Sequence, residues 1–498
     1  MYKSLDRSQL DFPGQFTIGK IKAVGYQANL LTGRKEMDIT DLVVEISIYE
    51  SINKKVLTGN VLINDSQNIT SHLPLTGFER IEFKVFTPGC SRGYDFTAKT
   101  GHPMYIYSIK NRTGGTGRNQ QYILNFCSKE FLRNEQTRVC RAEAGLTENA
   151  VFHIVRQELE SKKAVFLERT KSNHKFVLPR IRPFKAIDML KNAAHSQDHE
   201  TSGMVFYEDA NGFHFRSYEN MLALSSAQAR PVVANFSVKI PNAGESDIMQ
   251  RMNQVNSFSI DSQFDTLANY RKGVYCSRMV THDSFNKTFT ELDFNYNDEY
   301  ELSHHTEHDG EGGKQDIKTI APRLNFGGDK FVSDFPEGVL MFHSTTEKTH
   351  NNFEGPVSEI TTPRRISYQQ AFEAMKLTLE IPGFTGMSCG DLISFDHPNY
   401  EPVNESNPQD RDKFMSGRYL VKDVRHQFDI KAKKHSTIIV CIKDSVMNQF
   451  PQEVFDTFTE YEFDDSEANI IQQEVDKSIV TSANTTKTDR VPRFKGQR

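Results

Sequence analysis

The stretch His304-His-Thr-Glu-His308 is the place in this sequence where residue types and spacing best suit metal chemistry. On a helix His304 and His308 would share a face and Glu307 could assist them, but a zinc site normally uses three or four ligands on a rigid frame. A metalloprotease helix needs glutamate directly after its first histidine, and His305 stands there instead. The glycine-rich stretch Asp309-Gly-Glu-Gly-Gly follows. We therefore predict a surface loop without a functional metal.

Other residues that could do chemistry stand alone in the sequence. His282-Asp283 and His397-Pro398 are isolated and are weaker metal candidates than the His304–His308 stretch. The glycine-rich stretches 87–93 and 112–118 lack the ordered Gly-Lys-Ser/Thr of a phosphate-binding loop, so we interpret them as hairpin tips. No nucleophile elbow, catalytic cysteine setting or kinase motif occurs, although a glycosidase stays open because 65 acids could supply its carboxylate pair. We assign no catalytic, cofactor-binding or metal residue and expect no cofactor.

Composition limits the class of protein. A chain of 498 residues is long enough for two to four domains, since single cores stop growing at roughly 250 to 300 residues. Apolar residues make up 37% and charged residues 25%, which is typical of a soluble globular protein, and 36 Phe with 17 Tyr favour aromatic-rich β-structure. The net charge of −5 argues against binding nucleic acid by neutralising phosphates, and the six scattered cysteines favour reduced thiols. No apolar run approaches the roughly 18 residues of a membrane span, so we expect no stable membrane insertion.

Short runs rich in β-branched and aromatic residues, bounded by Gly, Pro, Asn or Asp, predict antiparallel strands of a small barrel or sandwich. Near the C-terminus they are Lys376–Gly383, Gly390–Phe395, Gly417–His426 and Ser436–Asp444. A similar order occurs near the N-terminus in Gly77–Phe83, Met104–Lys110 and Gln121–Glu130, after two further strands at Leu42–Tyr49 and Leu57–Asp65.

These two sets of strands align without gaps, which suggests an internal duplication. The alignment places Cys127 on Cys441, Lys129 on Lys443, Glu130 on Asp444 and, in the preceding strand, Tyr105 on Tyr419. The alternative is a pair of unrelated β domains that use the same kinds of hairpin.

Residues 132–253 change to α+β character. Apolar residues between Val151 and Leu159 share one face of a predicted helix that Thr147 could cap, and Pro183 stands where the first turn of a second helix would begin. The stretch Met204–Arg216 then predicts a β-hairpin of alternating aromatic residues.

The predicted hairpin turns at Asn211-Gly212, which would supply two positive φ angles. We interpret His214 on this hairpin as an outward polar residue and not as a ligand. After the hairpin, Val255–Asp261 and Gly273–Asp283 predict strands that begin a second barrel, and a short helix is expected from Tyr368 to Met375.

The sequence thus predicts a mainly β fold with α+β inserts, in which two antiparallel β-barrels carry insert domains. The predicted parts are an N-terminal arm (1–17), the first barrel (18–131), the α+β insert (132–253) and the first part of the second barrel (254–300). They continue with an insert that contains a short helix (301–375), the second part of the second barrel (376–446) and a C-terminal extension (447–498).

The C-terminal extension has acid-rich and base-rich ends. Between them Ile471, Val475 and Ile479 could form one marginal amphipathic helix, which we expect to become ordered only against a partner or a neighbouring subunit.

Taken in order, several of these segments resemble the baseplate hub protein of contractile-tailed bacteriophages, a relative of the N-terminal region of the VgrG spike of type VI secretion. The resemblance covers roughly residues 20–447, and the order of the segments carries more of it than any single motif. The segments are the early strand pair, the insert with Pro183–Ala194, the Tyr207–Phe213 hairpin, Gly273–Asp283, Gly390–Phe395 and Gly417–His426.

The resemblance implies a structural, non-enzymatic virion protein with two tail-tube-like barrels per chain. It implies a homotrimer whose six barrels adapt a six-fold tail tube to a three-fold cell-piercing spike, assembled in the host bacterial cytoplasm and located in the tail baseplate. The implied partners are the central spike protein, the tail tube protein or a tube initiator, the tape-measure protein and the baseplate wedge proteins, with DNA only passing through the channel.

Two alternatives from other classes stay open. A glycan-binding β-sandwich adhesin of a phage tail would bind a polysaccharide as a monomer. A zinc-dependent hydrolase would hold stoichiometric metal at His304 and His308, and whether those residues and His305 bind metal is open.

Overall fold

The chain divides into two units, Met1–Asn448 and Gln449–Arg498. The computed structural model describes residues 9–25, 33, 35–73, 75–114, 119–171, 174–199, 203–225, 228–238, 247–284, 286–307, 318–319, 332–344, 358–399, 412 and 414–446. The predicted helix of the C-terminal extension therefore lies outside the described residues.

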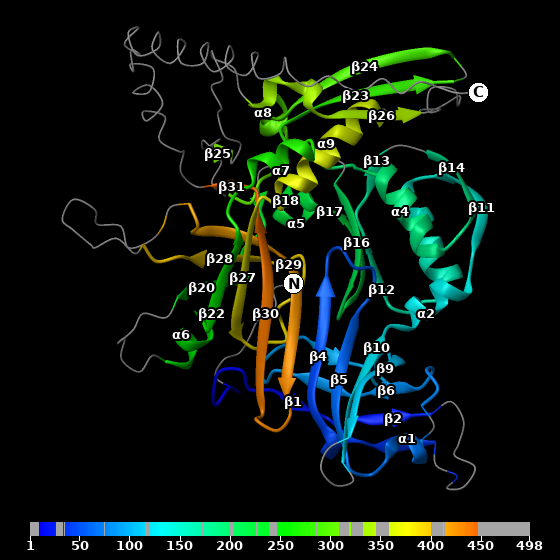
Figure 1. The fold of residues 1–498 in the computed structure, drawn as a ribbon, viewed down its shortest axis with the longest axis vertical. Helices are drawn as coiled ribbons and strands as arrows, with labels where there is room; N and C mark the ends of the chain where they lie inside the picture. Colours follow the sequence, from blue (N-terminus) through cyan, green and yellow to red (C-terminus); the bar gives the residue numbers. More distant parts are fainter. Residues whose placement is uncertain are drawn as a thin grey trace, which may run out of the picture. The chain divides into compact units, whose positions relative to one another are not determined.

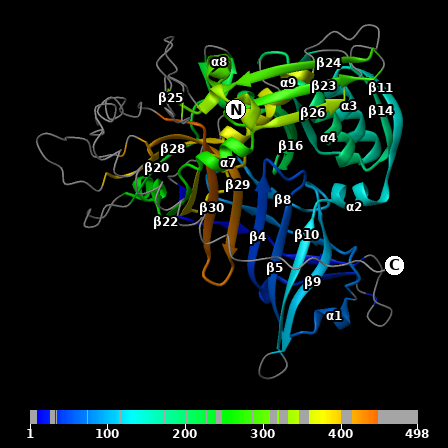
Figure 2. The same cartoon turned by 45° about the horizontal axis from the view of Figure 1, so that its top comes forward.

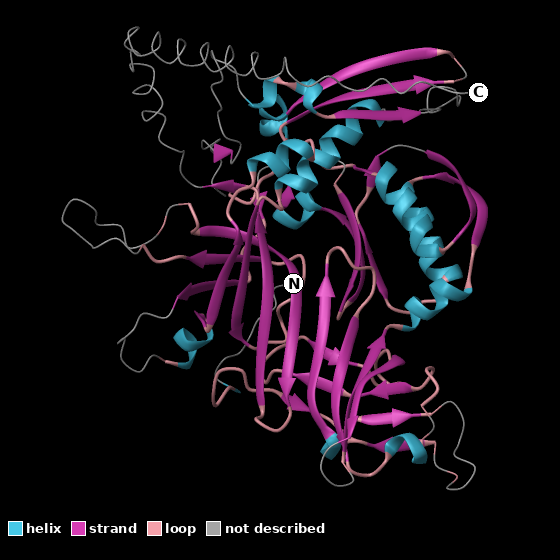
Figure 3. Cartoon of the chain, in the orientation of Figure 1, coloured by secondary structure: helices cyan, strands magenta, loops and turns pink. Residues whose placement is uncertain are grey.

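A 14-stranded sheet dominates the described part of the chain (Figure 3). Its strands are β2 (Lys22–Val24), β3 (Glu36–Asp38), β4 (Val43–Ser51), β5 (Thr58–Asp65), β6 (Arg80–Glu82), β9 (Met104–Gly114), β10 (Gln120–Cys127), β20 (Ala234–Val238), β21 (Gln254–Val255), β22 (Ser257–Ser262), β27 (Met375–Pro382), β28 (Leu392–Asp396), β29 (Gly417–Asp429) and β30 (Lys434–Lys443). The predicted mainly β class is confirmed.

Two segments of this sheet repeat one strand order. The first segment runs β4-β5-β10-β9-β6 and the second runs β22-β27-β30-β29-β28, with every neighbouring pair antiparallel. Across the sheet, the five strands of each segment therefore follow one another as the first, second, fifth, fourth and third strand along the chain. This repeat supports the predicted duplication, although described strand pairs close neither segment into a barrel and the two-barrel architecture stays a prediction.

The strand register corrects one detail of the sequence alignment. Cys127 pairs with Tyr105, whereas Cys441 pairs with Val421, and both cysteines are fully buried. If the two cysteines are equivalent, Tyr105 corresponds to Val421 and not to Tyr419. A gap-free alignment misses this offset because it does not carry the register of the neighbouring strand.

Strand β29 joins the two segments edge to edge (Figures 1 and 2). Its residues 417–420 pair with β28, and its residues 423–429 pair with β4 of the first segment. A β-bulge between Val421 and Asp423 separates these two stretches. The two segments consequently share one continuous hydrogen-bonded sheet.

The α+β insert contains the predicted helices and hairpin. Its helices are α2 (Lys129–Gln136), α3 (Thr147–His153), which continues as a π-helical turn over Ile154–Glu158, α4 (Pro183–Ala193) and α5 (Tyr218–Leu222). Its strands are β11 (Val139–Gly145) with β14 (His174–Ile181), β12 (Ala164–Leu167) with β17 (Gly212–Ser217) and β16 (Met204–Asp209), β13 (Thr170–Lys171) with β15 (His195–Ser196), and β18 (Ala223–Ser225) with β19 (Gln228–Ala229).

Pro183 begins α4 as predicted, but two details of the insert differ from prediction. Thr147 is the first helical residue and not the cap, since Leu146 holds the N-cap position. In the hairpin turn only Gly212 has a positive φ, whereas the prediction gave one to Asn211 as well. The Asp209 carboxylate accepts hydrogen bonds from the amides of Asn211 and Gly212, and these bonds stabilise the turn.

Residues 276–295 do not belong to the second segment. β23 (Cys276–Asp283) pairs with β24 (Thr288–Asn295) and with β26 (Leu340–Ser344) in a separate three-stranded sheet. Their assignment to the first part of a second barrel is therefore wrong, since they pair with the insert that follows. The predicted short helix also starts too late: α9 runs from Ser358 to Ala371, and the internal Pro363 hides its beginning in the sequence.

The remaining described strands and α-helices are short. They are β1 (Thr17–Ile18), β7 (Lys84–Phe86) and β8 (Gly93–Asp95) in one sheet, the pair β25 (Lys318–Thr319) and β31 (Ser445–Val446), and the helices α1 (Ile69–His72), α6 (Ile248–Met252), α7 (Thr266–Arg271) and α8 (Tyr296–Glu299).

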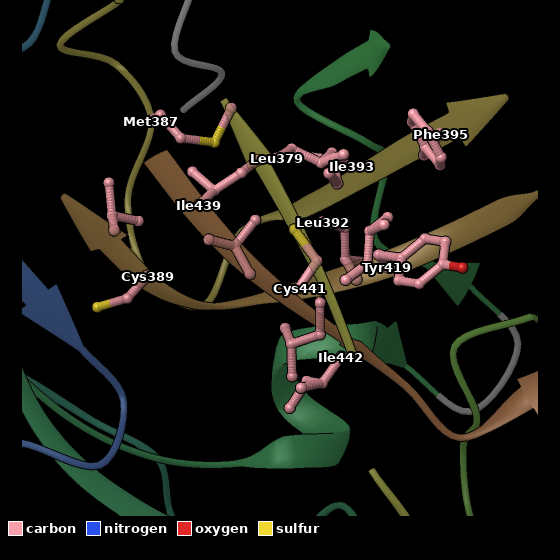
Figure 4. Packing of buried hydrophobic residues seen from close by; sticks show 14 of the residues in the cluster. Leu379, Met387, Cys389, Leu392, Ile393, Phe395, Tyr419, Ile439, Cys441 and Ile442 are labelled. Carbon is pink, nitrogen blue, oxygen red and sulfur yellow. The ribbon is translucent and has the colours of Figure 1, made fainter. Parts of the chain in front are cut away.

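The two segments have separate hydrophobic cores. The core of the first segment includes Ile46, Val61 and Phe126. The core of the second segment also takes in Tyr207 and Met221 from the α+β insert, so this part of the insert packs against the second segment. Figure 4 shows the strand side chains of this second core, among them Leu379, Leu392, Ile393, Phe395, Tyr419, Ile439, Cys441 and Ile442.

Candidate functional site: buried ionic anchors and open strand edges

The histidine-rich stretch folds against the end of β30. His305 is buried, with 2% of its side chain exposed, and its ring nitrogens lie 2.8 Å from an Asp444 carboxylate oxygen and 2.8 Å from the Tyr300 carbonyl oxygen. The prediction of a surface loop is therefore wrong for His305, because this polar stretch supplies the hydrogen bonds that a buried carboxylate requires. His308 lies outside the described residues.

The residues that follow His305 complete this contact. Thr306 donates to Asp444 from its amide, at 2.9 Å, and from its hydroxyl, at 2.8 Å. The Glu307 carboxylate lies 2.6 Å from the buried Lys443 ammonium. Burial alone would raise the pKa of Asp444, but His305 and Thr306 lower it overall, so the carboxylate is held in its charged form.

This geometry does not present a metal-ligand set. Both His305 ring nitrogens point at protein oxygens, and Glu307 is directed at Lys443. Among the residues that the structure describes, no three His, Cys, Asp or Glu side chains gather where they could hold a metal ion. A cavity of about 20 Å³ lies beside His305 and Tyr300, which is enough room for roughly one water molecule.

A second buried ionic contact, similar to that of His305 with Asp444, lies at the end of β10. We call these two contacts anchors, because each fastens an insert to the sheet. Lys163 of the α+β insert lies 2.8 Å from Glu130 and 2.5 Å from Glu208, and all three side chains are buried. Glu208 also accepts hydrogen bonds from the Leu57 amide and the Ser128 hydroxyl. Burial raises the pKa of Glu208. Burial would also raise the pKa of Glu130, but Lys163 and Ser161 together lower it overall.

The two anchors occupy equivalent places in the repeated sheet. Glu130 follows Cys127 by three residues, and Asp444 follows Cys441 by three residues. Each acid is buried directly after the last long strand of its segment, and each binds an insert through a basic or imidazole side chain, Lys163 or His305. The inserts are thus fastened at corresponding points of the two segments.

A third cluster joins both segments to the α+β insert. The Arg92 guanidinium lies 3.1 Å from Glu50 at the end of β4 and 3.3 Å from Asp209 of β16, and it donates to the Met387 carbonyl at 3.0 Å. No more than 5% of any of these three charged side chains is exposed. Burial would raise the pKa of Asp209, but Arg92 and His214 hold it well below its ordinary value.

His214 is not the outward residue that the hairpin pattern predicts. Its Nε2 lies 3.0 Å from Asp209, and its ring stacks between Phe166 and Tyr207 with 13% of the side chain exposed. The cause is β12, which pairs beside β17 in the same sheet and places Phe166 directly next to His214. Of the other lone histidines, His282 is exposed and His397 is buried.

Within the described residues, each of the two repeated segments keeps one open strand edge. β22 pairs only with β27, and β9 pairs with β6 only at Met104 and Tyr105, so its later residues have one open edge. Ile260 of β22 is 38% exposed, and Tyr107 of β9 is 43% exposed. An open edge offers unpaired backbone groups to another strand.

The sequence offered only indirect signs of these anchors. Arg92 lies in a glycine-rich loop, and Lys163 in an unpatterned connection, so local patterns do not predict either as a buried ionic residue. Charged pairs inside apolar runs, such as Glu208-Asp209 and Lys443-Asp444, are the available signal, since charges in such runs need buried partners. No helix among the described residues is both long and apolar enough to cross a membrane.

Comparison with known proteins finds a similar phage protein. No family model matches the sequence. The probable baseplate hub protein gp334 of Vibrio phage KVP40 is 19% identical over 416 residues, which cover 82% of this chain and 90% of that protein.

Similar solved structures are phage tail and type VI secretion proteins, each 9% identical to this chain. The tail protein from Neisseria meningitidis MC58 has a TM-score of 0.47 and covers 86% of this chain and 97% of its own. The 43 kDa tail protein of prophage MuSo2 from Shewanella oneidensis has a TM-score of 0.46 and covers 86% and 99%. The E. coli c3393 protein, a component of the type VI secretion system, has a TM-score of 0.37 and covers 85% and 77%. The resemblance to phage baseplate hub proteins that the sequence predicts is confirmed, because this chain is similar to one of them over most of its length.

Proposed function

We propose that this chain is a structural, non-enzymatic protein of a phage tail baseplate, a hub that forms a homotrimer and joins the six-fold tail tube to the three-fold spike. One observation carries the proposal: the same five-strand order occurs twice, and the two copies are already joined edge to edge through β29 and β4. Two copies in each chain would let three chains present six equivalent segments, which is the number that a six-fold tube requires.

The joint inside the chain suggests how neighbouring chains would meet. In the repeat, β9 is the equivalent of β29, and β22 is the equivalent of β4. The second half of β29 is covered by β4, while the second half of β9 and the outer edge of β22 are open. If each subunit boundary repeats the internal joint, β22 of one chain lies along β9 of the next, and the closed ring leaves none of these edges exposed.

Strand register makes this proposal specific to single residues. Counting three pairs along each ladder from Cys127 and Cys441 makes Ile109 the equivalent of Arg425. On the opposite side of each cysteine, the residue two strands away is Tyr49 in the first segment and Ile260 in the second. Ile260 is therefore the equivalent of Tyr49. Arg425 pairs directly with Tyr49. Ile109 of one subunit should therefore face Ile260 of its neighbour.

Cysteine crosslinking tests this pairing. The double variant Ile109→Cys/Ile260→Cys should form a disulfide between neighbouring chains under mild oxidation and run as a covalent trimer under denaturing conditions, since directly paired strand residues lie within disulfide reach. Each single variant is a control, and Ile109→Cys/Phe258→Cys moves the partner by two residues along the same face of β22. Crosslinking that is equal in both double variants would contradict the register.

The symmetry of the particle tests the function itself. Negative-stain images of the purified protein should show a ring with three-fold symmetry and pseudo-six-fold texture. A stable monomer or dimer at assembly concentrations would overturn the hub proposal, and a monomer that binds a polysaccharide would favour the adhesin. In the proposed hub the inserts project from the ring and contact the spike and wedge proteins. The tube, the tape-measure protein and DNA follow the central channel.

A further inference from the structure

The N-terminal strap, residues 9–18, connects the two segments. Leu10 is buried in the core of the second segment, whereas Phe16 and Ile18 pack against the core of the first. β1 at the end of the strap pairs with β7, and the Gly14 carbonyl accepts a hydrogen bond of 2.9 Å from the His435 amide of β30. The strap therefore lies across the joint that β29 and β4 form.

A buried pair of histidines lies under this strap. His426 Nδ1 and His435 Nε2 are 3.1 Å apart, and His426 Nε2 lies 3.2 Å from the Met387 carbonyl oxygen. Both histidines are fully buried, and the Phe16 ring of the strap meets the His435 ring edge-on at 6.4 Å. Because a carbonyl only accepts, His426 carries its proton on Nε2, and His435 Nε2 donates to His426 Nδ1. Both rings are neutral in this arrangement.

An added proton is poorly placed in the closed structure. On His426 Nδ1 it would face the N–H of His435 beside the shared Thr437 hydroxyl, and on His435 Nδ1 it would be a buried donor with no hydrogen-bond partner among the described residues. Burial, followed by the neighbouring His426, holds the pKa of His435 well below its ordinary value.

The charged groups around the pair do not offset this cost. The Tyr94 ring meets His426 edge-on, and its hydroxyl donates to Glu50, whose charge is matched by Arg92. On the strap, Asp11 is exposed and bonds to Gln15. The loop that follows β27 contributes the Met387 carbonyl, and β30 contributes the Thr437 hydroxyl.

We propose that the His426–His435 pair makes the N-terminal strap pH-sensitive, so that the strap stays docked near neutral pH and detaches as the solution is acidified. A detached strap exposes His435 to water, where an imidazole binds a proton with a pKa near 6.5. Stability of the docked strap is thus complete above about pH 6.5 and is lost as the pH falls below it. For one linked proton, the opening equilibrium rises about tenfold per pH unit.

Hydrogen exchange measured by mass spectrometry on the assembled full-length protein tests the proposal. Protection factors, which divide out the intrinsic pH dependence of exchange, should fall for residues 9–18 by up to about thirtyfold between pH 7.5 and pH 5.0. Peptides of the β16–β17 hairpin report on the rest of the molecule and should change less. Strap protection that stays constant over this range would overturn the proposal.

Variants show whether the histidine pair is the cause. In His426→Gln/His435→Gln the strap should keep the same protection at both pH values, and in the exposed-histidine control His282→Gln it should behave as in the wild type. If the double variant does not fold, His435→Gln alone should show a smaller fall than the wild type, because the exposed His435 imidazole binds the linked proton, and an unchanged fall would contradict the proposal. Gly14→Ala should lower strap protection already at pH 7.5, since its Cβ would lie 2.5 Å from the His435 carbonyl oxygen.

Discussion

Replacing Arg92 with methionine tests whether the three-way ionic cluster holds the joint together. Arg92→Met keeps much of the side-chain volume but leaves Glu50 and Asp209 as buried acids without their shared cation. Removing one partner of a buried ion pair typically costs about 3–5 kcal/mol, because an uncompensated charge remains in a poorly solvated place. The unit Met1–Asn448 has an unfolding entropy of about 0.9 kcal/mol/K at roughly 2.1 cal/mol/K per residue, so the melting temperature should fall by about 3–5 °C.

Differential scanning fluorimetry at pH 7.5 measures this shift, and the chain supplies a matched control. Arg278 also binds two acids, Asp293 and Glu337, but at the surface of β23, so Arg278→Met should leave the melting temperature nearly unchanged. Adding Glu50→Gln and Asp209→Asn to Arg92→Met should restore part of the lost stability by removing the stranded charges. Equal shifts for Arg92→Met and Arg278→Met would refute the reasoning.

Three further predictions concern other sites. Gly59→Ala should destabilise the protein by about 1–3 kcal/mol in denaturant unfolding, since its Cβ would lie 2.3 Å from the Phe126 ring, and a neutral result would show that this core yields easily. Burial lowers the pKa of His195 to about 4, so the contribution of the neutral His195 ring to the free energy of unfolding is complete above about pH 6.5. The free energy of unfolding should fall by up to about 3 kcal/mol as the pH drops toward 4, and this fall should be absent in His195→Asn. His305→Ala should increase hydrogen exchange around Asp444 without changing the zinc content measured by elemental analysis, and loss of one tightly held zinc per chain would overturn the structural role.

Local patterns in the sequence predicted the elements well. Alternation between Leu42 and Tyr49 corresponds to β4, the aromatic run around Asn211-Gly212 forms the β16–β17 hairpin, and Pro183 begins α4. Each of these signals depends on neighbouring residues only, since side-chain period and turn chemistry act over a few positions. These local signals therefore do not depend on which distant segments pair with the element.

Long-range pairing accounts for what sequence patterns missed. His305 sits in a polar, glycine-flanked stretch that looks solvated until Asp444, 139 residues further along the chain, needs partners. Strands β23 and β24 have ordinary strand patterns, and nothing local tells whether they pair with β27 or with β26. The buried position of Arg92 likewise depends on Asp209 from another part of the chain. Local period determines which residues form a strand but leaves its partners undetermined.

The bulge in β29 also governs where this chain can change length. Losing one residue between 423 and 429 would slip two hydrogen-bonded ladders together, those with β4 and β30, and would turn buried side chains such as Val424 and Phe428 toward the opposite face. Lys422 is different, because the ladder to β30 passes over it and the residues on either side keep their partners. A gain or loss of one residue there would be absorbed locally. The bulge is therefore the position in β29 where an insertion or a deletion of one residue leaves both halves of the sheet in register.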